Sequence, residues 1–489
     1  MAKRTTVIDI GSNSVRMVVY EKTSRFAFHI LHEARAKVRL GENAYQNSGN
    51  LQEIPMQRAY DALENFLSIS SSLKSRKILC VATSALRDAP NKKIFLKKVS
   101  TNLKLNIKII DGAKEAYLGS MACVNLLPKL ETAISIDIGG GSTEISMITN
   151  QNIQNTISLK LGTVRLKELF FDKNTIEDAT NYIDNKLEVL NDFNAKTIIG
   201  IGGTFRAMSS AIMKNSNYPL KKIHAFEIEP LKFKNFLTKI IDADKEELLK
   251  LNIKEDRFDI IKPGALILSR LLHKLSSITN LITSGVGVRE GLYLSDLLRN
   301  SKDKFPSNYN VSVRYLIDNN IDDTNFSNQL NQLSKNIFNL THNHLSLDKS
   351  YRYELSTASK LYPVGSSIHY YSQNKHSYYL IQSALEYGFT HKQIQLISTL
   401  NRYAEKKLPS DAHTQKYQDI LPIKKDLDSL SYLISLTVAL LSHKPRNIDF
   451  EMNFDSGILY ISSKHNLLLA KEAVRKLEGN DSIKIKFIL

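Results

Sequence analysis

Apolar and polar positions alternate along the first 300 residues in short blocks that predict strands followed by helices. Residues 5–20 are typical of strand, tight turn and strand, and residues 53–74 carry apolar side chains at helical spacing. The stretches KILCVATSALRDAPN and LNIKIIDGAKEAYLGSMACVNLL each predict a strand that enters a helix, the second helix starting near Ala113. Strands that alternate with helices indicate an α/β layer fold.

The same pattern starts again near Leu130. TAISIDIGGGSTEISMI predicts strand, turn and strand, and residues 153–170, IQNTISLKLGTVRLKELF, continue as a strand-like run. A helix follows, and then AKTIIGIGGTFRAMSSAI predicts strand, glycine turn and helix; NLITSGVGVREGLYLSDLL closes this half in the same way. Residues 1–128 and 129–297 therefore predict two copies of one architecture.

The pattern changes after residue 300. SKDKFPSNYN is polar and contains proline, which is typical of a linker, and residues 311–443 predict mainly helices. Residues 445–489 predict strand, turn, strand, helix and strand. We expect four domains: two α/β lobes at 1–128 and 129–300, a helical domain at 301–444 and a small α+β domain at 445–489.

Composition agrees with a soluble globular protein. Of the 489 residues, 42% are hydrophobic and 24% are charged, and no apolar run reaches the roughly 20 residues of a membrane span. The apolar run near the N-terminus is too short for a signal peptide. The two cysteines agree with a reducing compartment, and Cys80 lies in a run typical of a buried strand. We expect a cytoplasmic protein without a membrane partner.

The chain is strongly basic, with 66 Lys and Arg against 49 Asp and Glu and a formal net charge of +17. A basic surface attracts nucleic acid, anionic lipid or a phosphate-rich substrate. A proteome that is rich in lysine throughout explains the same excess. Because the cations are scattered rather than gathered in one run, we expect no specific nucleic-acid partner.

An echo in the sequence points to phosphate chemistry. Asp-Ile-Gly-x-x-Ser occurs at Asp9 and again at Asp137, in each case between two predicted strands. Glycines let backbone N–H groups converge on an anion, although a plain β-hairpin with a glycine bulge has the same pattern. Asp137 and Glu144 flank the second turn, and carboxylates suit Mg²⁺ or an orienting contact to water. The candidate phosphate-binding residues of this turn are Gly139, Gly140, Gly141, Ser142 and Thr143.

Other turns supply further donors for phosphate oxygens. Hydroxyl, amide and guanidinium groups follow the first strand, a Thr-Ser pair opens a helix, and GIGGTFR adds a third glycine turn. Simple helix capping also explains the Thr-Ser pair. These candidates are Ser12, Asn13, Ser14, Arg16, Thr83, Ser84, Arg87, Gly202, Gly203 and Thr204. A Walker A motif and a dinucleotide-binding fingerprint are both absent from the sequence.

Glu115 is the candidate general base. It lies early in the helix predicted from Ala113, where a carboxylate also stabilises the helix dipole. If the side chain faces a cleft, it can accept a proton from an attacking water.

Taken together, the motifs resemble the exopolyphosphatase / guanosine pentaphosphate phosphohydrolase family of the actin-like superfamily. The resemblance covers residues 5–297 and rests on the order of DIGSNSVR, ATSALRDAPN, DGAKEAYLG, DIGGGSTE, LGTVRLKE, GIGGTFR, KPGALIL and GVGVREGL. It implies two ribonuclease-H-like lobes, hydrolysis of the terminal phosphate of polyphosphate or guanosine pentaphosphate, and Mg²⁺ as helper. It also implies that Glu115 is the catalytic base and that Asp137 and Glu144 serve metal and water.

The helical half resembles the long members of this family, whose helical domain is related to HD phosphohydrolases. The family pattern carries a His-Asp pair where this chain has Tyr362 and Pro363. We therefore expect a helical domain that has lost its metal site, with His369 and His376 as packing or surface residues.

Two other functions remain open from the sequence. A phosphotransferase of the same superfamily would need a phosphate acceptor, and a basic polyphosphate- or nucleic-acid-binding protein would have an inactive cleft. A homodimer is a further expectation, since a long basic helical half can support one.

Overall fold

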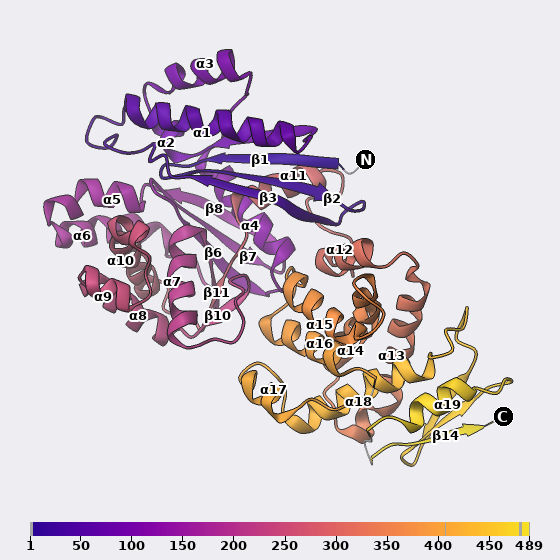
Figure 1. The fold of residues 1–489 in the computed structure, drawn as a ribbon. Helices are drawn as coiled ribbons and strands as arrows, with labels where there is room; N and C mark the ends of the chain where they lie inside the picture. The colour runs from indigo at the N-terminus through magenta and orange to yellow at the C-terminus, as the bar shows by residue number, and fades with distance from the viewer. Residues whose placement is uncertain (1–2, 406, 479–481, 489) are drawn as a thin grey trace. The chain divides into compact units, whose positions relative to one another are not determined.

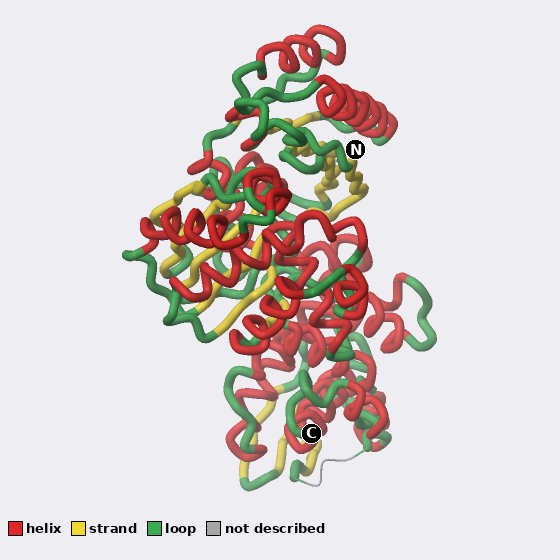
Figure 2. Tube along the Cα trace, turned by 90° about the vertical axis from the view of Figure 1, so that its left-hand side faces the viewer, coloured by secondary structure: helices red, strands yellow, loops and turns green. Residues whose placement is uncertain are grey.

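The computed structural model describes residues 3–405, 407–478 and 482–488, and the chain divides into two compact units. The first unit runs from Met1 to Tyr309 and the second from Asn310 to Leu489. The first contains two sheets with their helices, and in the second the strands lie near the C-terminus (Figures 1 and 2).

The first sheet has the order β3-β2-β1-β4-β5. Its strands are β1 (Lys3–Ile10), β2 (Val15–Lys22), β3 (Phe28–Ala36), β4 (Lys77–Ala82) and β5 (Lys108–Ile109). β1, β2 and β3 pair antiparallel, whereas β4 pairs parallel to β1 and β5 parallel to β4. The tight turn after β1 and the crossover helices produce this mixed sheet, because only antiparallel neighbours can be joined by a short turn.

The second sheet repeats this arrangement. Its strands are β6 (Thr132–Ile138), β7 (Thr143–Thr149), β8 (Asn152–Leu159), β9 (Thr197–Ile201), β10 (Phe226–Ile228) and β11 (Asn280–Thr283). The order β8-β7-β6-β9-β11 corresponds to β3-β2-β1-β4-β5, and β10 adds one further antiparallel strand at the edge. Two lobes with one strand order confirm the prediction of paired ribonuclease-H-like, actin-like lobes.

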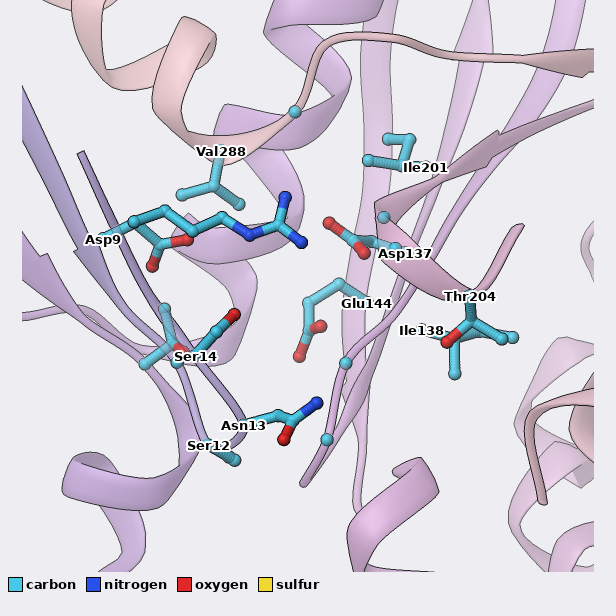
Figure 3. A pocket seen from close by; sticks show the side chains of 18 of the residues that line it. Asp9, Ser12, Asn13, Ser14, Asp137, Ile138, Glu144, Ile201, Thr204 and Val288 are labelled. Carbon is cyan, nitrogen blue, oxygen red and sulfur yellow. The ribbon is translucent and has the colours of Figure 1, made fainter. Parts of the chain in front are cut away.

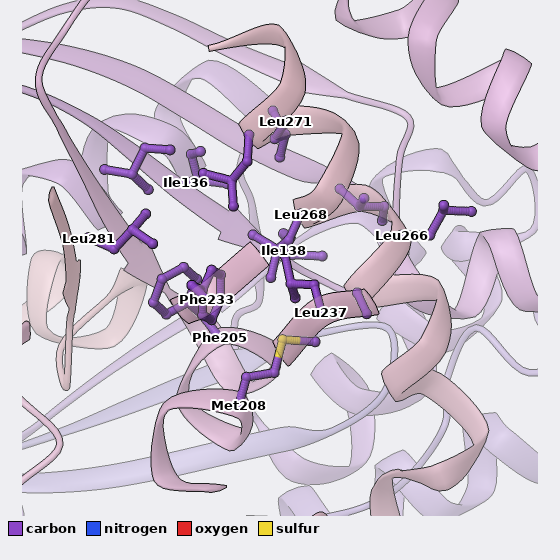
Figure 4. Packing of buried hydrophobic residues seen from close by; sticks show 14 of the residues in the cluster. Ile136, Ile138, Phe205, Met208, Phe233, Leu237, Leu266, Leu268, Leu271 and Leu281 are labelled. Carbon is purple, nitrogen blue, oxygen red and sulfur yellow. The ribbon is translucent and has the colours of Figure 1, made fainter. Parts of the chain in front are cut away.

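Helices cover these sheets. Those of the first unit are α1 (Glu53–Ser72), α2 (Ser84–Asp88), α3 (Lys92–Leu103), α4 (Gly112–Leu126), α5 (Thr163–Leu169), α6 (Ile176–Leu187), α7 (Gly202–Asn215), α8 (Pro230–Asp242), α9 (Lys245–Lys250), α10 (Phe258–Lys274) and α11 (Val288–Leu297). In the second lobe, β6 packs against α7, α8 and α10 (Figure 4). Phe205 and Phe233 are fully buried there with ring centroids 5.0 Å apart. Burial of such side chains contributes roughly 1.5–3 kcal/mol each.

One prediction was wrong in its detail. Residues 153–170 were expected as one strand-like run, but β8 ends at Leu159 and α5 begins at Thr163. The backbone N–H groups of Thr163 and Val164 donate to the carbonyls of Gly139 and Gly140 at 3.0 and 2.8 Å. The glycine turn therefore holds the start of α5, which local apolar spacing does not reveal.

The second unit is helical and ends in a small sheet, as expected. Its helices are α12 (Val311–Asn320), α13 (Thr324–Leu345), α14 (Tyr351–Leu361), α15 (Gln373–Ala384), α16 (His391–Tyr403), α17 (Asp411–Lys416) and α18 (Lys424–Leu440). β12 (Glu451–Asp455), β13 (Ile458–Ser462), α19 (Leu468–Arg475) and β14 (Lys484–Ile488) follow. Leu459 and Ile461 of β13 belong to the same buried cluster as the helices, so the sheet shares their core.

The residues considered for a metal site in the helical unit differ in their exposure to solvent. Tyr362 is buried and its hydroxyl donates to the Glu405 carboxylate, and Pro363 is buried beside it. His369 is exposed and His376 is half-buried. The loss of a metal site stays a prediction. None of the helices within the described residues is both long and apolar enough for a membrane crossing.

Helices α4 and α11 pack so closely that one residue cannot carry a side chain. A Cβ at Gly291 would lie 2.0 Å from the carbonyl oxygen of Leu118. We expect Gly291→Ala to destabilise the first unit by about 1–3 kcal/mol, because backbone must move to admit the methyl group. Scanning calorimetry should show a melting temperature lower by several degrees.

The matched control is Gly119→Ala on α4, where the new Cβ would meet Ile201 Cδ1 at an ordinary 3.5 Å. Equal melting temperatures for the two variants would contradict the close crossing of these helices.

Candidate active site

The two hairpin turns are built alike. In the first, the N–H of Gly11 donates to the carbonyl of Ser14 at 3.2 Å, and in the second the N–H of Gly139 donates to the carbonyl of Ser142 at 2.9 Å. The first turn follows the end of β1 at Ile10, and the second follows the end of β6 at Ile138. The repeated sequence motif therefore forms the same turn in both lobes.

Strand register places a charged pair on each hairpin. Asp9 lies opposite Arg16 across β1 and β2, and Asp137 lies opposite Glu144 across β6 and β7. Residues directly opposite in an antiparallel pair project on the same face. Each hairpin thus presents a carboxylate beside a second charged group, which is a cation in the first lobe and an acid in the second.

The turns meet across one cavity. A Cβ at Gly140 would lie 3.0 Å from Ser12 Cβ and 3.6 Å from the backbone nitrogen of Asn13, so the two turns approach each other closely. A pocket of about 140 Å³ is lined from both lobes. Figure 3 shows Asp9 and Asn13 on one side and Asp137 on the other.

Most of the residues predicted from the sequence line this pocket. They are Ser12, Asn13, Ser14, Arg16, Thr83, Ser84, Glu115, Asp137, Gly139, Gly140, Ser142, Glu144, Gly202, Gly203 and Thr204. Thr83 stands at the N-terminal cap position of α2 without a capping bond from its side chain, and Ser84 Oγ lies 2.8 Å from Ser12 Oγ.

Three predicted residues lie outside the lining. Thr143 is buried and its hydroxyl donates to the carbonyl of Leu161 at 2.6 Å, which is a structural contact. Gly141 packs beside Ser12, since a Cβ there would lie 3.0 Å from Ser12 Oγ. Arg87 lies outside the lining but donates a hydrogen bond to Glu115, which lines the pocket.

Gly202 has a conformational requirement of its own. Its φ is +84°, a region that favours glycine, at the junction of β9 and α7. A Cβ there would lie 2.2 Å from Asp137 Oδ1. The start of α7 can therefore stand directly beside the Asp137 carboxylate.

Glu115 is held in the first turn of α4. The Asp111 side chain caps this helix by accepting from the N–H of Lys114 at 2.7 Å. Glu115 is 9% exposed, and Arg87 Nη1 donates to its Oε2 at 2.8 Å. Burial, followed by the neighbouring Glu144, raises the pKa of Glu115 well above its usual value, against the opposing effect of Arg87.

The other carboxyls of the pocket also hold protons more tightly than in water. Burial raises the pKa of Asp137 to about 6 and that of Glu144 to about 7. Glu144 Oε1 accepts from Ser158 Oγ at 2.8 Å. Burial likewise raises the pKa of Asp9, whose Oδ1 has no hydrogen-bond partner among the described residues. The site is thus suited to proton transfer near neutral pH.

Arginines crowd the rest of the pocket. Besides Arg16 and Arg206, the lining includes Arg35, Arg257 and Arg289. Burial and the neighbouring guanidinium groups lower the pKa of Arg16 to about 10. An incoming polyanion would relieve this repulsion.

Sequence reasoning missed part of this set. Arg289 lies within the GVGVREGL motif, and Arg206 stands beside Thr204, so both had a signal. Arg35 on β3 and Arg257 before α10 had none, because no motif surrounds them. Asp9 was singled out in the echo but not as a site residue.

The family model for Ppx/GppA phosphatases matches residues 18–300, which is more than half of the chain. The chain belongs to the Ppx/GppA phosphatase family. A second model, for domain III of this phosphatase, matches residues 310–476. The first turn, Ser12 to Arg16, precedes the matched span, so its place in the site rests on the geometry above.

Curated relatives agree with this Ppx/GppA assignment. The chain is 32% identical over 285 residues to a bifunctional 3-dehydroquinate synthase/phosphatase of Fusobacterium nucleatum, covering 54% of this chain and 42% of that protein. It therefore spans less than half of that relative. A guanosine-5'-triphosphate,3'-diphosphate pyrophosphatase of Photobacterium profundum is 25% identical, over 90% of this chain and 87% of the relative.

Solved structures share the fold. The Aquifex aeolicus family member has a TM-score of 0.53 at 25% identity, covering 62% of this chain and 99% of that one. An exopolyphosphatase of Cytophaga hutchinsonii has a TM-score of 0.56 at 22% identity, covering 62% and 100%.

The proximity of Glu115 and Glu144 makes a prediction about titration. Glu144→Gln removes the like charge beside Glu115, so the pKa of Glu115 should fall. Carbon-13 NMR of labelled glutamate carboxyls, assigned by the loss of one signal in Glu115→Gln, measures this shift. An unchanged or raised Glu115 pKa would show that Glu144 does not act on it.

Arg87→Gln should have the opposite effect. Without the guanidinium at 2.8 Å, the charged form of Glu115 loses its ion pair and its pKa should rise. The same NMR titration measures it, and exposed Lys93→Gln on α3 is the control. A fall in the pKa would contradict the ion pair.

Proposed function

We propose that this phosphatase removes the terminal phosphate of inorganic polyphosphate, of guanosine pentaphosphate or of both by attack of water in the pocket between its lobes. The observation that carries the proposal is the lining of that pocket: two matching turns, a set of carboxyls and a set of arginines converge on one cavity. The names of the Photobacterium and Cytophaga relatives support both substrates.

In this proposal Glu115 is the general base. Its carboxyl faces the cavity from the start of α4, and its raised pKa gives it the basicity to remove a proton from water near neutral pH. Arg87 holds the carboxylate in place through its 2.8 Å ion pair. Proton transfer of this kind needs a water that donates a hydrogen bond to the Glu115 carboxylate and lies in line for attack on the terminal phosphorus.

The turns and arginines would hold the phosphoryl group. Hydroxyls of Ser12 and Ser14 and backbone amides of the glycine turn are donors for phosphate oxygens, and Arg16 carries the charge to match. In phosphoryl transfer most of the acceleration comes from positioning and charge stabilisation. A pocket with fixed donors supplies both.

The residues present also suit Mg²⁺. Within the described part of the chain no group of three or more His, Cys, Asp or Glu side chains could hold a metal by itself. Mg²⁺, however, commonly takes one or two carboxylates together with substrate phosphates. Asp137 and the unpaired Oδ1 of Asp9 fit that donor set, with Glu144 beside Asp137. The ion would neutralise charge on the phosphate oxygens.

The proposal predicts that Glu115→Gln lowers kcat by roughly 10²–10⁴-fold with little change in substrate binding, because the amide keeps the shape of the side chain but cannot accept the proton. Release of phosphate from polyphosphate and from guanosine pentaphosphate should be measured side by side, with and without Mg²⁺ and without any acceptor. Exposed Glu131→Gln is the matched control.

Turnover by Glu115→Gln equal to that of the control would remove this residue from the mechanism. Phosphate transfer that depends on an added acceptor would instead indicate a phosphotransferase. A homodimer stays a prediction.

A further inference from the structure

A second cavity lies at the start of β1, at the opposite end of the strand from the first turn. It has a volume of about 380 Å³ and shares no lining residue with the pocket between the lobes. Six cationic side chains line it against one carboxylate, that of Asp296. The cations are Lys3, Arg4, Lys22, Arg76, Lys77 and Arg299.

The fold brings these charges together against their mutual repulsion. Lys3 lies directly opposite Lys22 across β1 and β2, and like charges in that position are destabilising. Among the described residues neither lysine forms an ion pair within 4.0 Å, although the Asp296 carboxylate acts on Lys22 from a greater distance. Burial and the nearby Lys3 lower the pKa of Lys22, which reports the same crowding.

The carboxylate of the cavity is already shared. Asp296 accepts from Lys77 at 2.5 Å and from Arg299 at 2.9 Å. Glu21, outside the lining, pairs with Arg4. The lining of this cavity therefore carries more positive than negative charge, which favours an anion from outside.

A buried phenol adds an independent sign of a ligand. Tyr293 lines the cavity and is 2% exposed, and its hydroxyl has no hydrogen-bond partner among the described residues. Its ring stacks on Tyr20 at 4.2 Å, which fixes its position. A buried hydroxyl without a partner is costly in a folded protein, so a ligand oxygen in this cavity would satisfy it.

We propose that this cavity is a second anion site that binds an oligophosphate group. Several closely spaced cations together with a hydroxyl donor suit a ligand that concentrates many negative oxygens in a small volume, as linked phosphates do. The ligand can be a polyphosphate chain or the phosphates of a nucleotide. The site does not require hydrolysis in the pocket between the lobes, so it stands apart from the proposed function.

The position of the cavity separates it from the active-site pocket. β1 runs for eight residues from Lys3 to Ile10, or about 25 Å, and the first turn follows its end (Figure 1). The cavity is lined by Lys3, Arg4 and Thr5 at its start. Helix α11 also serves both places, since Arg289 and Glu290 line the pocket while Tyr293 and Asp296 line the cavity. One short oligophosphate therefore cannot fill both sites, whereas a long chain can extend from one toward the other.

Calorimetric titration of the full chain with tripolyphosphate, in chelator so that no turnover occurs, tests the site. Wild type should bind at two sites, and the double variant Lys3→Gln/Lys22→Gln should lose at least about tenfold in affinity at one of them. Tyr293→Phe, which removes only the hydroxyl, should weaken the same site by less. The control, Lys93→Gln/Lys97→Gln on α3, removes equal charge from an exposed face.

Melting curves check that each variant folds. Competition by long-chain polyphosphate and by guanosine tetraphosphate then identifies the source of the phosphates, and displacement by either supports the site. A single site in wild type, or the same loss in the control pair as in Lys3→Gln/Lys22→Gln, would overturn the proposal. Glu115→Gln should keep this binding, so an inactive pocket and an absent second site give different results.

Discussion

Pairing of position i with position i+7 across each hairpin is the constraint on which the site depends. It sets Asp9 beside Arg16 and Asp137 beside Glu144 on corresponding faces of two sheets with one strand order. A slip of one residue in either hairpin would turn these side chains to the opposite face. The packing of the strands opposes such a slip, because it would take Ile8 and Ile136 out of the buried clusters to which they belong.

Opposed charges share the pocket without cancelling one another. Glu144 raises the pKa of Glu115, Asp137 raises that of Glu144, and Arg16 is crowded by other guanidinium groups. Such an arrangement costs stability in the free protein, and the proposed binding of a phosphate group would relieve it. The carboxyls suit proton transfer and the arginines suit a polyanion, so the two sets divide the work of a phosphatase.

Two helices, α4 and α11, connect the pocket to the rest of the first unit. α4 presents Glu115 at its start, and Gly291 allows α11 to cross it at close range. Glu290 on α11 accepts from the hydroxyl of Tyr20 on β2 at 2.8 Å and from the N–H of Gly287 at 2.7 Å. A buried polar contact therefore ties the second lobe to the first, and it does so on the helix that also reaches the second cavity.

The sequence by itself determined the two lobes and their turns, because apolar periodicity and glycine placement are local and repeat at corresponding positions. It also singled out Glu115 as a candidate, and the structure places this residue in the pocket lining. It did not reveal α5, whose start is held by carbonyls of a turn more than twenty positions earlier. It also missed Arg35 and Arg257, and it gave no sign that Lys3 and Lys22 meet. Such groupings depend on strand pairing and packing between distant segments, which only the tertiary structure decides.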